Sequence, residues 1–157
     1  MKNYSPQEAR EKIKRYCAYQ ERAHQEVRNK LYEYGLYKSD VEEIIVDLIT
    51  EGFLNEERYA KAFAGGKFRM KKWGRLKITH ALESKGLTAN CIRSGLTEID
   101  QEDYEQTLKD LLIKKTNEVE ADNIYTKRDK LSKAVILKGY EPELVWKILR
   151  TVLPDHK

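Results

Sequence analysis

The sequence contains few of the residues that build metal centres or disulfides. Its 157 residues include 2 cysteines and 3 histidines, and none has a cysteine or histidine partner at the spacing of a metal-binding motif. Cys17 and Cys91 are isolated, and we expect both to be small buried side chains on apolar helix faces. We expect His24 and His156 to lie at the surface. The sequence therefore predicts no disulfide, no metal site and no cofactor.

Long apolar runs are absent as well. No stretch of about 18 apolar residues occurs, and the N-terminal residues lack the apolar segment of a signal peptide. We therefore expect a cytoplasmic protein without a membrane segment.

Motifs of common enzymes are also missing. The sequence has no glycine-rich phosphate-binding loop, no nucleophile elbow and no HExxH zinc motif. Carboxylates are plentiful, but none is an isolated acid on an apolar helix face, where a general acid would often stand. We therefore predict that the protein is not an enzyme. A metal-dependent nuclease that draws its ligands from the acidic stretches is the weakest of the alternatives.

One pattern occurs three times along the chain. Gly35, Gly86 and Gly139 stand about 50 residues apart. Apolar residues stand at the same offsets from each glycine, four and eight positions before it and six, ten and thirteen after it. They are Val27, Leu31, Val41, Ile45 and Leu48; Ile78, Leu82, Ile92, Leu96 and Ile99; and Leu131, Val135, Val145, Leu149 and Val152. These offsets have the period of a helix, so each glycine is expected to end one helix and precede another.

Residues that start helices stand where this pattern requires them. Ser39 and Glu42 have the spacing of a capping box, Thr88 can cap a helix, and Pro142 suits a first helical turn. A further helix is expected before each pair. These additional helices should begin near Ser5, Asn55 and Gln101.

The pair Gly65-Gly66 falls inside the helix expected after Asn55. Each glycine lowers helix stability by about 1 kcal/mol relative to alanine, so we predict a kink, a frayed turn or an early helix end. The pair is either a tolerated weak spot or a hinge, and the sequence favours neither.

These segments predict an all-α fold without strands. We expect a tandem array of three three-helix repeats, with bounds 5–53, 54–100 and 101–154. Because a repeat of this size buries little surface alone, stacking against its neighbour should stabilise it. We expect an elongated monomer, and whether the array curves stays open at this point.

Charge is segregated along the chain, although the net charge is only +4. Residues 39–57 contain acids and no base, and residues 58–82 contain bases and no acid. The densest cations surround Trp73 and are Lys67, Arg69, Lys71, Lys72, Arg75 and Lys77. A second basic stretch contains Lys127, Arg128, Lys130, Lys133 and Lys138, of which the first four are the binding candidates. Such runs are usually solvated helix faces, and Trp73 can simply pack between helices. Alternatively, the cations bind nucleic-acid phosphates while Trp73 stacks on a base, or they bind an acidic protein groove.

Three stretches match the pattern of a known family. Residues 16–31, followed by Gly35, resemble Y-L-A-x-R-E-x-S-x-x-E-L-R-x-K-L…G. Residues 48–60 are similar to L-x-E-x-G-[FYLI]-[LI]-[DN]-[DE]-x-[RK]-[FY]-A, the most specific of the three. Residues 73–87 are similar to G-x-x-[RK]-[IL]-x-x-x-L-x-x-K-G-[IVL]. Together they resemble the bacterial regulatory protein RecX family over about residues 10–153.

The chain departs from the family pattern in a few places. Ala23 stands where the family usually has a serine, and the loss of that helix cap costs about 1 kcal/mol. Tyr19 and Gln20 replace common basic residues, and Gly65-Gly66 replaces a basic helical segment. The resemblance therefore supports the fold more firmly than any basic contact made by the first repeat.

The resemblance implies three tandem three-helix repeats and a modulator of the recombinase RecA. Such proteins bind the RecA filament on single-stranded DNA, lie in its helical groove and limit strand exchange, ATP hydrolysis and coprotease activity. They act in homologous recombination, DNA repair and the SOS response. The implied partner is the RecA filament, with weak binding to single-stranded DNA, and the cations around Trp73 and in the second stretch are candidates for these contacts.

The alternative function is a DNA-binding module that acts without RecA, either non-specific or similar to a helix-turn-helix protein. No helix carries the mixture of Asn, Gln and Arg that reads base edges, which argues against a sequence-specific regulator.

Overall fold

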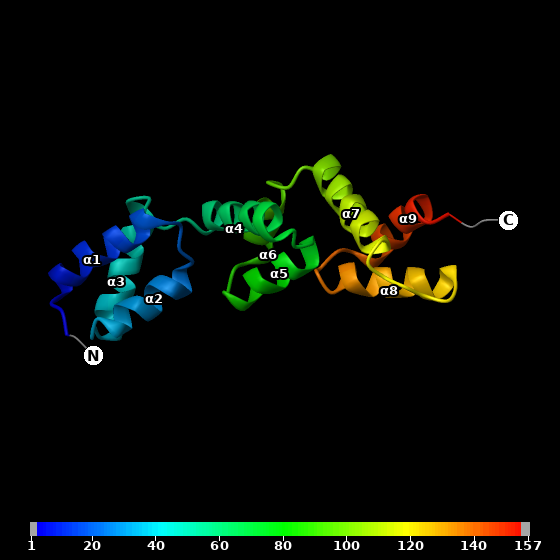
Figure 1. Ribbon diagram of the computed structural model, residues 1–157. Helices are drawn as coiled ribbons and strands as arrows, with labels where there is room; N and C mark the ends of the chain where they lie inside the picture. Colours follow the sequence, from blue (N-terminus) through cyan, green and yellow to red (C-terminus); the bar gives the residue numbers. More distant parts are fainter. Residues whose placement is uncertain (1–2, 155–157) are drawn as a thin grey trace. The chain divides into compact units, whose positions relative to one another are not determined.

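The computed structural model describes residues 3–154, which form helices and no strand (Figure 1). The nine helices of this part of the chain are α1 Pro6–Tyr19, α2 His24–Glu33, α3 Lys38–Thr50, α4 Glu56–Lys71, α5 Arg75–Ser84, α6 Ala89–Leu96, α7 Gln101–Thr116, α8 Ile124–Ile136 and α9 Pro142–Val152. The all-α prediction is confirmed, and the helices begin and end close to the residues that the sequence pattern indicates.

The three repeat glycines end helices as predicted. Gly35, Gly86 and Gly139 have φ values of +88°, +82° and +103°, which lie in the left-handed region that suits glycine just past a helix end. Each backbone N–H donates to a carbonyl three residues earlier, at 2.9 Å in all three cases. The periodic apolar pattern on either side therefore belongs to two separate helices.

Most of the predicted helix starts are confirmed. Ser5 and Glu8 form a full capping box at α1, and Pro142 lies in the first turn of α9. The Thr88 hydroxyl accepts from the Cys91 N–H at 3.2 Å, and the Asn55 side chain accepts from the Arg58 N–H at 2.9 Å. These side chains satisfy backbone donors that the first helical turn leaves without a partner.

The capping box predicted at Ser39 is wrong. Helix α3 begins at Lys38, with Tyr37 before it and no side-chain cap, so Ser39 already lies inside the first turn. Glu42 instead accepts two hydrogen bonds from the Arg28 guanidinium of α2, at 2.8 and 3.2 Å. A charged partner from another helix has taken the carboxylate that the capping box would have used.

The predicted early end at the glycine pair is also wrong, because α4 continues through Gly65 and Gly66 to Lys71. Gly65 is buried, and a Cβ at this position would lie 2.8 Å from the Arg69 guanidinium. Close packing around Gly65 holds the helix where propensity alone disfavours it. Gly66 has open space around its Cα.

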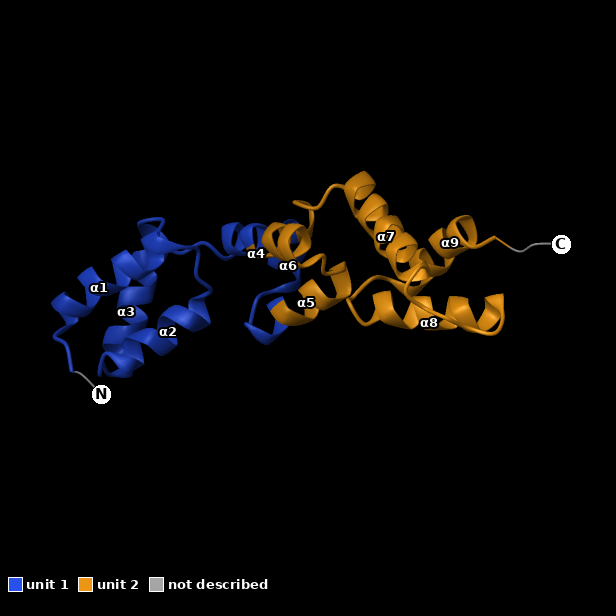
Figure 2. Cartoon of the chain, viewed as in Figure 1, with its two compact units in different colours: residues 1–62, 82–95 blue, residues 63–81, 96–157 orange. Residues whose placement is uncertain are grey.

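The chain divides into two compact units (Figure 2). In the described part, unit 1 consists of residues 3–62 and 82–95, and unit 2 of residues 63–81 and 96–154. Helices α1, α2 and α3 pack together in unit 1, and α7, α8 and α9 pack together in unit 2. The bounds of the three expected repeats stay a prediction.

Unit 1 has an aliphatic core. Its buried side chains from α1, α2 and α3 are Ala9, Ile13, Cys17, Val27, Leu31, Val41, Ile44, Ile45 and Leu48. The prediction for the cysteines is correct for Cys17 and wrong for Cys91, which is only half-buried. His24 is not a surface residue either, because its Nε2 is buried without a hydrogen-bond partner among the described residues. His156 lies outside the described residues.

Unit 2 has an aromatic centre within its aliphatic core. The rings of Phe68, Tyr104 and Tyr140 form a row, with centroids 5.8 and 5.0 Å apart. The Tyr104 hydroxyl accepts from the Arg75 N–H at 2.9 Å and bonds the Glu141 carboxylate. The Tyr140 hydroxyl donates to the Lys72 carbonyl at 2.9 Å. The buried hydroxyls thus hold the chain segment between α4 and α5 against the rest of unit 2.

Candidate partner-binding surface

Two glycines let two loops of unit 2 meet backbone to backbone. The Gly74 N–H donates to the Lys138 carbonyl and the Leu76 N–H donates to the Gly139 carbonyl, each at 2.9 Å. A Cβ on Gly74 would lie 2.2 Å from the Gly139 carbonyl carbon, so no larger residue fits. We call this contact the main-chain clasp. It joins the cations around Trp73 to cations at the end of α8.

Lysines gather around the main-chain clasp. Lys72 has a φ of +57° and turns the chain out of α4, and the Lys138 ammonium lies 3.4 Å from the Lys71 carbonyl oxygen. Burial lowers the pKa of Lys138, and the charges of Lys77, Lys115 and Lys72 lower this pKa further. We define the lysine face as Lys71, Lys72, Lys77, Lys115 and Lys138.

The lysine face has little acidic compensation. Among the described residues, Lys115 is paired with Glu118 at 3.9 Å, and no ion pair neutralises the other four ammonium groups. Exposed apolar side chains come from the same segments: Met70 and Leu137 are each 83% exposed. A surface with several unpaired like charges favours binding of a partner that supplies anionic groups.

Trp73 is half-buried and packs edge-on against Phe63, with ring centroids 6.5 Å apart and planes at 68°. The ammonium groups of Lys67 and Lys77 lie 5.0 and 4.6 Å from its ring centroid. This geometry favours the packing interpretation, in which Trp73 also holds two cations by cation–π attraction. A stacking role for Trp73 on a base stays a prediction.

Two of the candidate arginines already have partners inside unit 2. Arg75 donates to the Glu141 carboxylate at 3.0 Å and to the Gln101 side chain, and its guanidinium lies 3.9 Å from the Tyr104 ring centroid. Arg128 is buried and donates to the Leu153 carbonyl at the end of α9. Both arginines therefore stabilise the fold, which leaves them less able to bind a partner.

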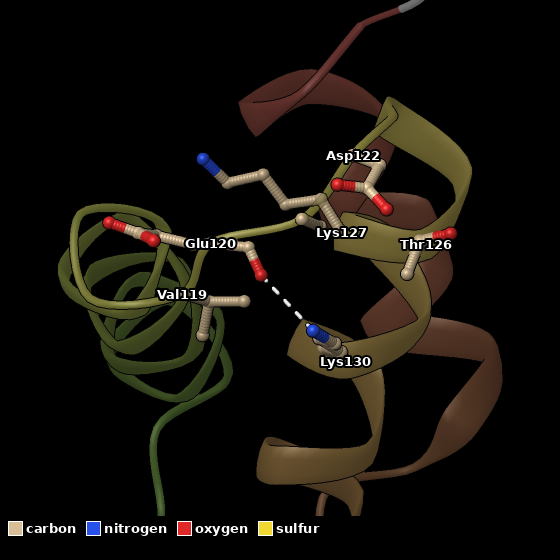
Figure 3. Close-up of a pocket in the computed structure, with 7 residues that line it drawn as sticks. Val119, Glu120, Asp122, Thr126, Lys127 and Lys130 are labelled. Atoms are coloured by element: carbon tan, nitrogen blue, oxygen red, sulfur yellow. Dashed lines mark hydrogen bonds between the residues drawn. The ribbon is translucent and has the colours of Figure 1, made fainter.

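Two lysines of the second basic stretch, Lys127 and Lys130, line a hollow of about 530 Å³ that also has acids in its wall (Figure 3). Lys130 donates to the Glu120 carbonyl at 3.1 Å, and Lys127 and Asp122 line the same hollow. Lys133 is paired with Asp129 at 3.0 Å. This surface is mixed in charge, unlike the lysine face.

The remaining candidates on α4 differ in their surroundings. Arg69 and Lys71 are exposed, whereas Lys67 is half-buried against Phe63 and Trp73. Lys138 belongs to the second basic stretch but was not one of its binding candidates, and Lys115 was not singled out from the sequence. Lys138 also directly precedes a repeat glycine, as Lys85 does in the second copy.

The described part of the chain contains no candidate metal site and no candidate membrane-spanning helix. It holds no group of three His, Cys, Asp or Glu side chains that could bind a metal ion. None of the nine helices is long and apolar enough to cross a membrane.

The fold and this surface define an all-helical repeat protein with a basic face. The family model described as "RecX, second three-helix domain" matches residues 55–96. The regulatory protein RecX of Clostridium perfringens (strain 13 / Type A) is 34% identical over 128 residues, which is 80% of this chain and 59% of the relative. That of Clostridium acetobutylicum is 28% identical over 136 residues, 83% of this chain and 62% of the relative. Together, the family model and these relatives support assignment of the chain to the RecX family.

Solved structures agree with this assignment in fold. The crystal structure of RecX from Lactobacillus salivarius aligns with a TM-score of 0.86 at 22% identity, covering 94% of this chain and 96% of that one. A second crystal structure, of regulatory protein RecX, aligns with a TM-score of 0.82 at 21% identity. The alignment covers 91% of this chain and 70% of that one. The chain spans about three fifths of the length of the curated relatives named above.

Proposed function

We propose that this protein regulates RecA without catalysis, by binding the RecA filament on single-stranded DNA in the cytoplasm. Occupancy of the filament groove would limit strand exchange, ATP hydrolysis and coprotease activity, and so act on recombination, DNA repair and the SOS response. The chain would consist of three three-helix repeats, 5–53, 54–100 and 101–154, and the match to residues 55–96 supports the second.

The lysine face is the observation that carries this proposal. Burial lowers the pKa of Lys138, and the charges of Lys77, Lys115 and Lys72 lower it further, so these ammonium groups repel one another in the free protein. Carboxylates or phosphates on a filament would relieve this repulsion. Binding should therefore be electrostatically steered and should weaken as salt is raised.

The test measures ATP hydrolysis by RecA filaments on single-stranded DNA while the protein is titrated in. Combined Lys72→Glu, Lys77→Glu and Lys138→Glu substitutions should raise the concentration needed for inhibition by about ten-fold or more, because attraction is replaced by repulsion. The matched comparison is Lys127→Glu, Lys130→Glu and Lys133→Glu, which alters two lysines of the mixed-charge hollow and the neighbouring Lys133. We expect a smaller effect there, since Glu120 and Asp122 also line the hollow and Asp129 pairs with Lys133.

Equal inhibition by the wild type and by the first triple variant would rule out the lysine face. The alternative function, a DNA-binding module that acts without RecA, has the same lysine face in its favour, because phosphates and carboxylates are both suitable anions. Salt-dependent binding to bare DNA, without any change in RecA ATP hydrolysis, would establish that alternative.

A further inference from the structure

Unit 1 contains a second cationic surface that differs from the lysine face, because it is built largely from aromatic rings. Residues of α1, of α2 and of the segments next to them line a hollow of about 460 Å³; the two helices are labelled in Figure 1. Four tyrosines line it: Tyr4, Tyr16, Tyr19 and Tyr34. Four bases complete the lining, and no acid does: Lys12, Arg15, Arg22 and Lys30. We call this hollow the tyrosine pocket. Its volume is in the range of about 300–1,000 Å³ found for small-molecule sites.

One stacked pair is already fixed within the tyrosine pocket. The Arg22 guanidinium carbon lies 3.7 Å from the Tyr16 ring centroid, and Arg22 Nε donates to the Tyr16 carbonyl at 3.0 Å. The hydrogen bond and the ring together hold the planar guanidinium in place. A fixed guanidinium plane is a surface on which a nucleobase can stack.

A free aromatic ring stands close to this pair. Tyr19 is 83% exposed, and its ring centroid lies 5.9 Å from the Arg22 guanidinium carbon. Tyr4 and Tyr34, which also line the pocket, form an edge-on pair with centroids 5.3 Å apart. Burial raises the pKa of Tyr34, so this hydroxyl is neutral at pH 7 and adds no negative charge.

The charge of the tyrosine pocket is only slightly compensated. Lys30 is paired with Glu33 at 3.5 Å, and its ammonium also lies 5.6 Å from the Tyr16 ring centroid. Lys12 lies 4.8 Å from the Tyr4 ring centroid. Arg15 is exposed, and no ion pair or hydrogen bond holds its side chain among the described residues. Cations are therefore available at the rim of an aromatic hollow.

From this arrangement we propose that the tyrosine pocket binds a nucleotide, with the base stacked on Tyr19 and the Arg22 guanidinium and the phosphate held by Lys12 and Arg15. A nucleotide joins a planar ring system to an anion, which are the two groups that this lining accommodates. An acidic peptide would satisfy the cations but would leave the rings without stacking partners. The nucleotide can be free or part of a single strand. The proposal is independent of RecA regulation.

The experiment follows fluorescence anisotropy of a labelled oligothymidine with the full chain and no recombinase. Tyr19→Ala should weaken binding about five-fold or more, and Tyr19→Phe should leave it unchanged, since only the ring is needed. The matched control is Tyr37→Ala, because Tyr37 is 82% exposed, lies in unit 1 and is not in the pocket. Arg15→Ala should reduce the slope of log affinity against log salt by about 0.7, whereas Lys38→Ala should not.

A second readout locates the base directly. Photo-crosslinking with an oligonucleotide that carries 5-iodouracil should attach the strand to a tyrosine of the pocket. Competition by thymidine monophosphate would identify a site for free nucleotides, and competition by the oligonucleotide alone would identify a site for a strand. Equal losses for Tyr19→Ala and Tyr37→Ala, crosslinks confined to unit 2, or equal competition by inorganic phosphate or by a polyglutamate peptide would each overturn the proposal. None of these results bears on inhibition of RecA.

Discussion

The helices of unit 1 place bases next to acids, whereas the lysine face of unit 2 places bases next to one another. In unit 1, Arg28 binds Glu42 at 2.8 Å, Lys14 lies 3.3 Å from Glu51, and Arg10 binds Asp47. In unit 2, the charges around Lys138 are ammonium groups. Exposed ion pairs contribute little to stability, typically about 0–1 kcal/mol each. The ion pairs of unit 1, compared with the single pair of Lys115 and Glu118 on the lysine face, therefore say more about partners than about folding.

Two of the repeat glycines differ in what surrounds them. Gly139 in unit 2 has φ of +103°, and a Cβ there would lie 2.4 Å from the Lys77 Cβ and 2.6 Å from the Lys77 nitrogen. Gly86 in unit 1 has φ of +82° and open space around it. Gly139 is required both by its left-handed backbone and by the close approach of Lys77. Gly86 is required by its left-handed backbone alone.

The largest expected effect comes from testing this difference between glycines. Gly139→Ala should lower the free energy of unfolding by more than about 3 kcal/mol, because the methyl group forces the main-chain clasp apart. Gly86→Ala should cost only about 1–2 kcal/mol, the penalty of a left-handed residue. Urea unfolding followed by circular dichroism measures both. Equal losses would mean that the main-chain clasp opens easily and does not distinguish unit 2.

Removal of the buried Tyr104 hydroxyl of unit 2 should have the next largest effect on the free energy of unfolding. Tyr104→Phe leaves the Arg75 N–H without its acceptor and should cost about 1–3 kcal/mol of unfolding free energy. Tyr125→Phe is the control, because Tyr125 lies on α8 of the same unit and is 73% exposed. A loss in the control as large as in Tyr104→Phe would contradict a specific role for the buried hydroxyl.

The same variant should change the response to alkaline pH. Burial raises the pKa of Tyr104, and its bond to Glu141 raises this pKa further. The folded state therefore favours the neutral phenol, and this contribution is fully present below pH 10 and is lost as pH rises above it. Unfolding free energies measured at pH values from about 9 to 11 should fall less steeply in Tyr104→Phe than in the wild type.

The smallest expected effect is opposite in sign in the two units. Raising sodium chloride from about 0.05 to about 0.5 M screens attraction in unit 1 and repulsion on the lysine face. Amide protection in α1 and α3 should fall by a few tenths of a kcal/mol, while protection at the main-chain clasp should rise by a similar amount. Hydrogen exchange with mass spectrometry resolves these segments.

Lys138→Gln should reduce the salt-induced rise in amide protection at the main-chain clasp. Lys109→Gln, a substitution at an exposed position elsewhere in unit 2, should leave this rise unchanged. A salt response of the same sign in both units would show that charge pairing does not distinguish them.

Local sequence signals predicted most of the fold. Periodic apolar positions, the repeat glycines and caps such as Ser5 and Asn55 act within a few residues, so their effects follow from spacing. The capping box predicted at Ser39 is wrong because Arg28, on another helix, binds Glu42. The early helix end predicted at Gly65 is wrong because packing around this glycine outweighs its low helix propensity. Both errors arise from contacts between segments, which spacing does not reveal.

The candidate site was less predictable for the same reason. The basic cluster around Trp73 was visible as a run of cations, but Lys115 and Lys138 join it only through contacts distant in sequence. Arg75 appeared equivalent to its neighbours, yet Glu141 binds it. The tyrosine pocket takes five of its lining residues from the stretch 12–22, but Tyr4, Lys30 and Tyr34 join them only through folding.

The main-chain clasp has a consequence for how this surface can change. It is made from backbone hydrogen bonds at Gly74 and Gly139, so its geometry requires no particular side chain around it, and the nearby lysines change its stability by only a few tenths of a kcal/mol. Substitutions at Lys72, Lys77 or Lys138 can therefore alter what the face binds without altering the scaffold that presents it. Recognition and architecture are separable here, which makes this face a suitable place for mutation or design to redirect the protein to a new partner.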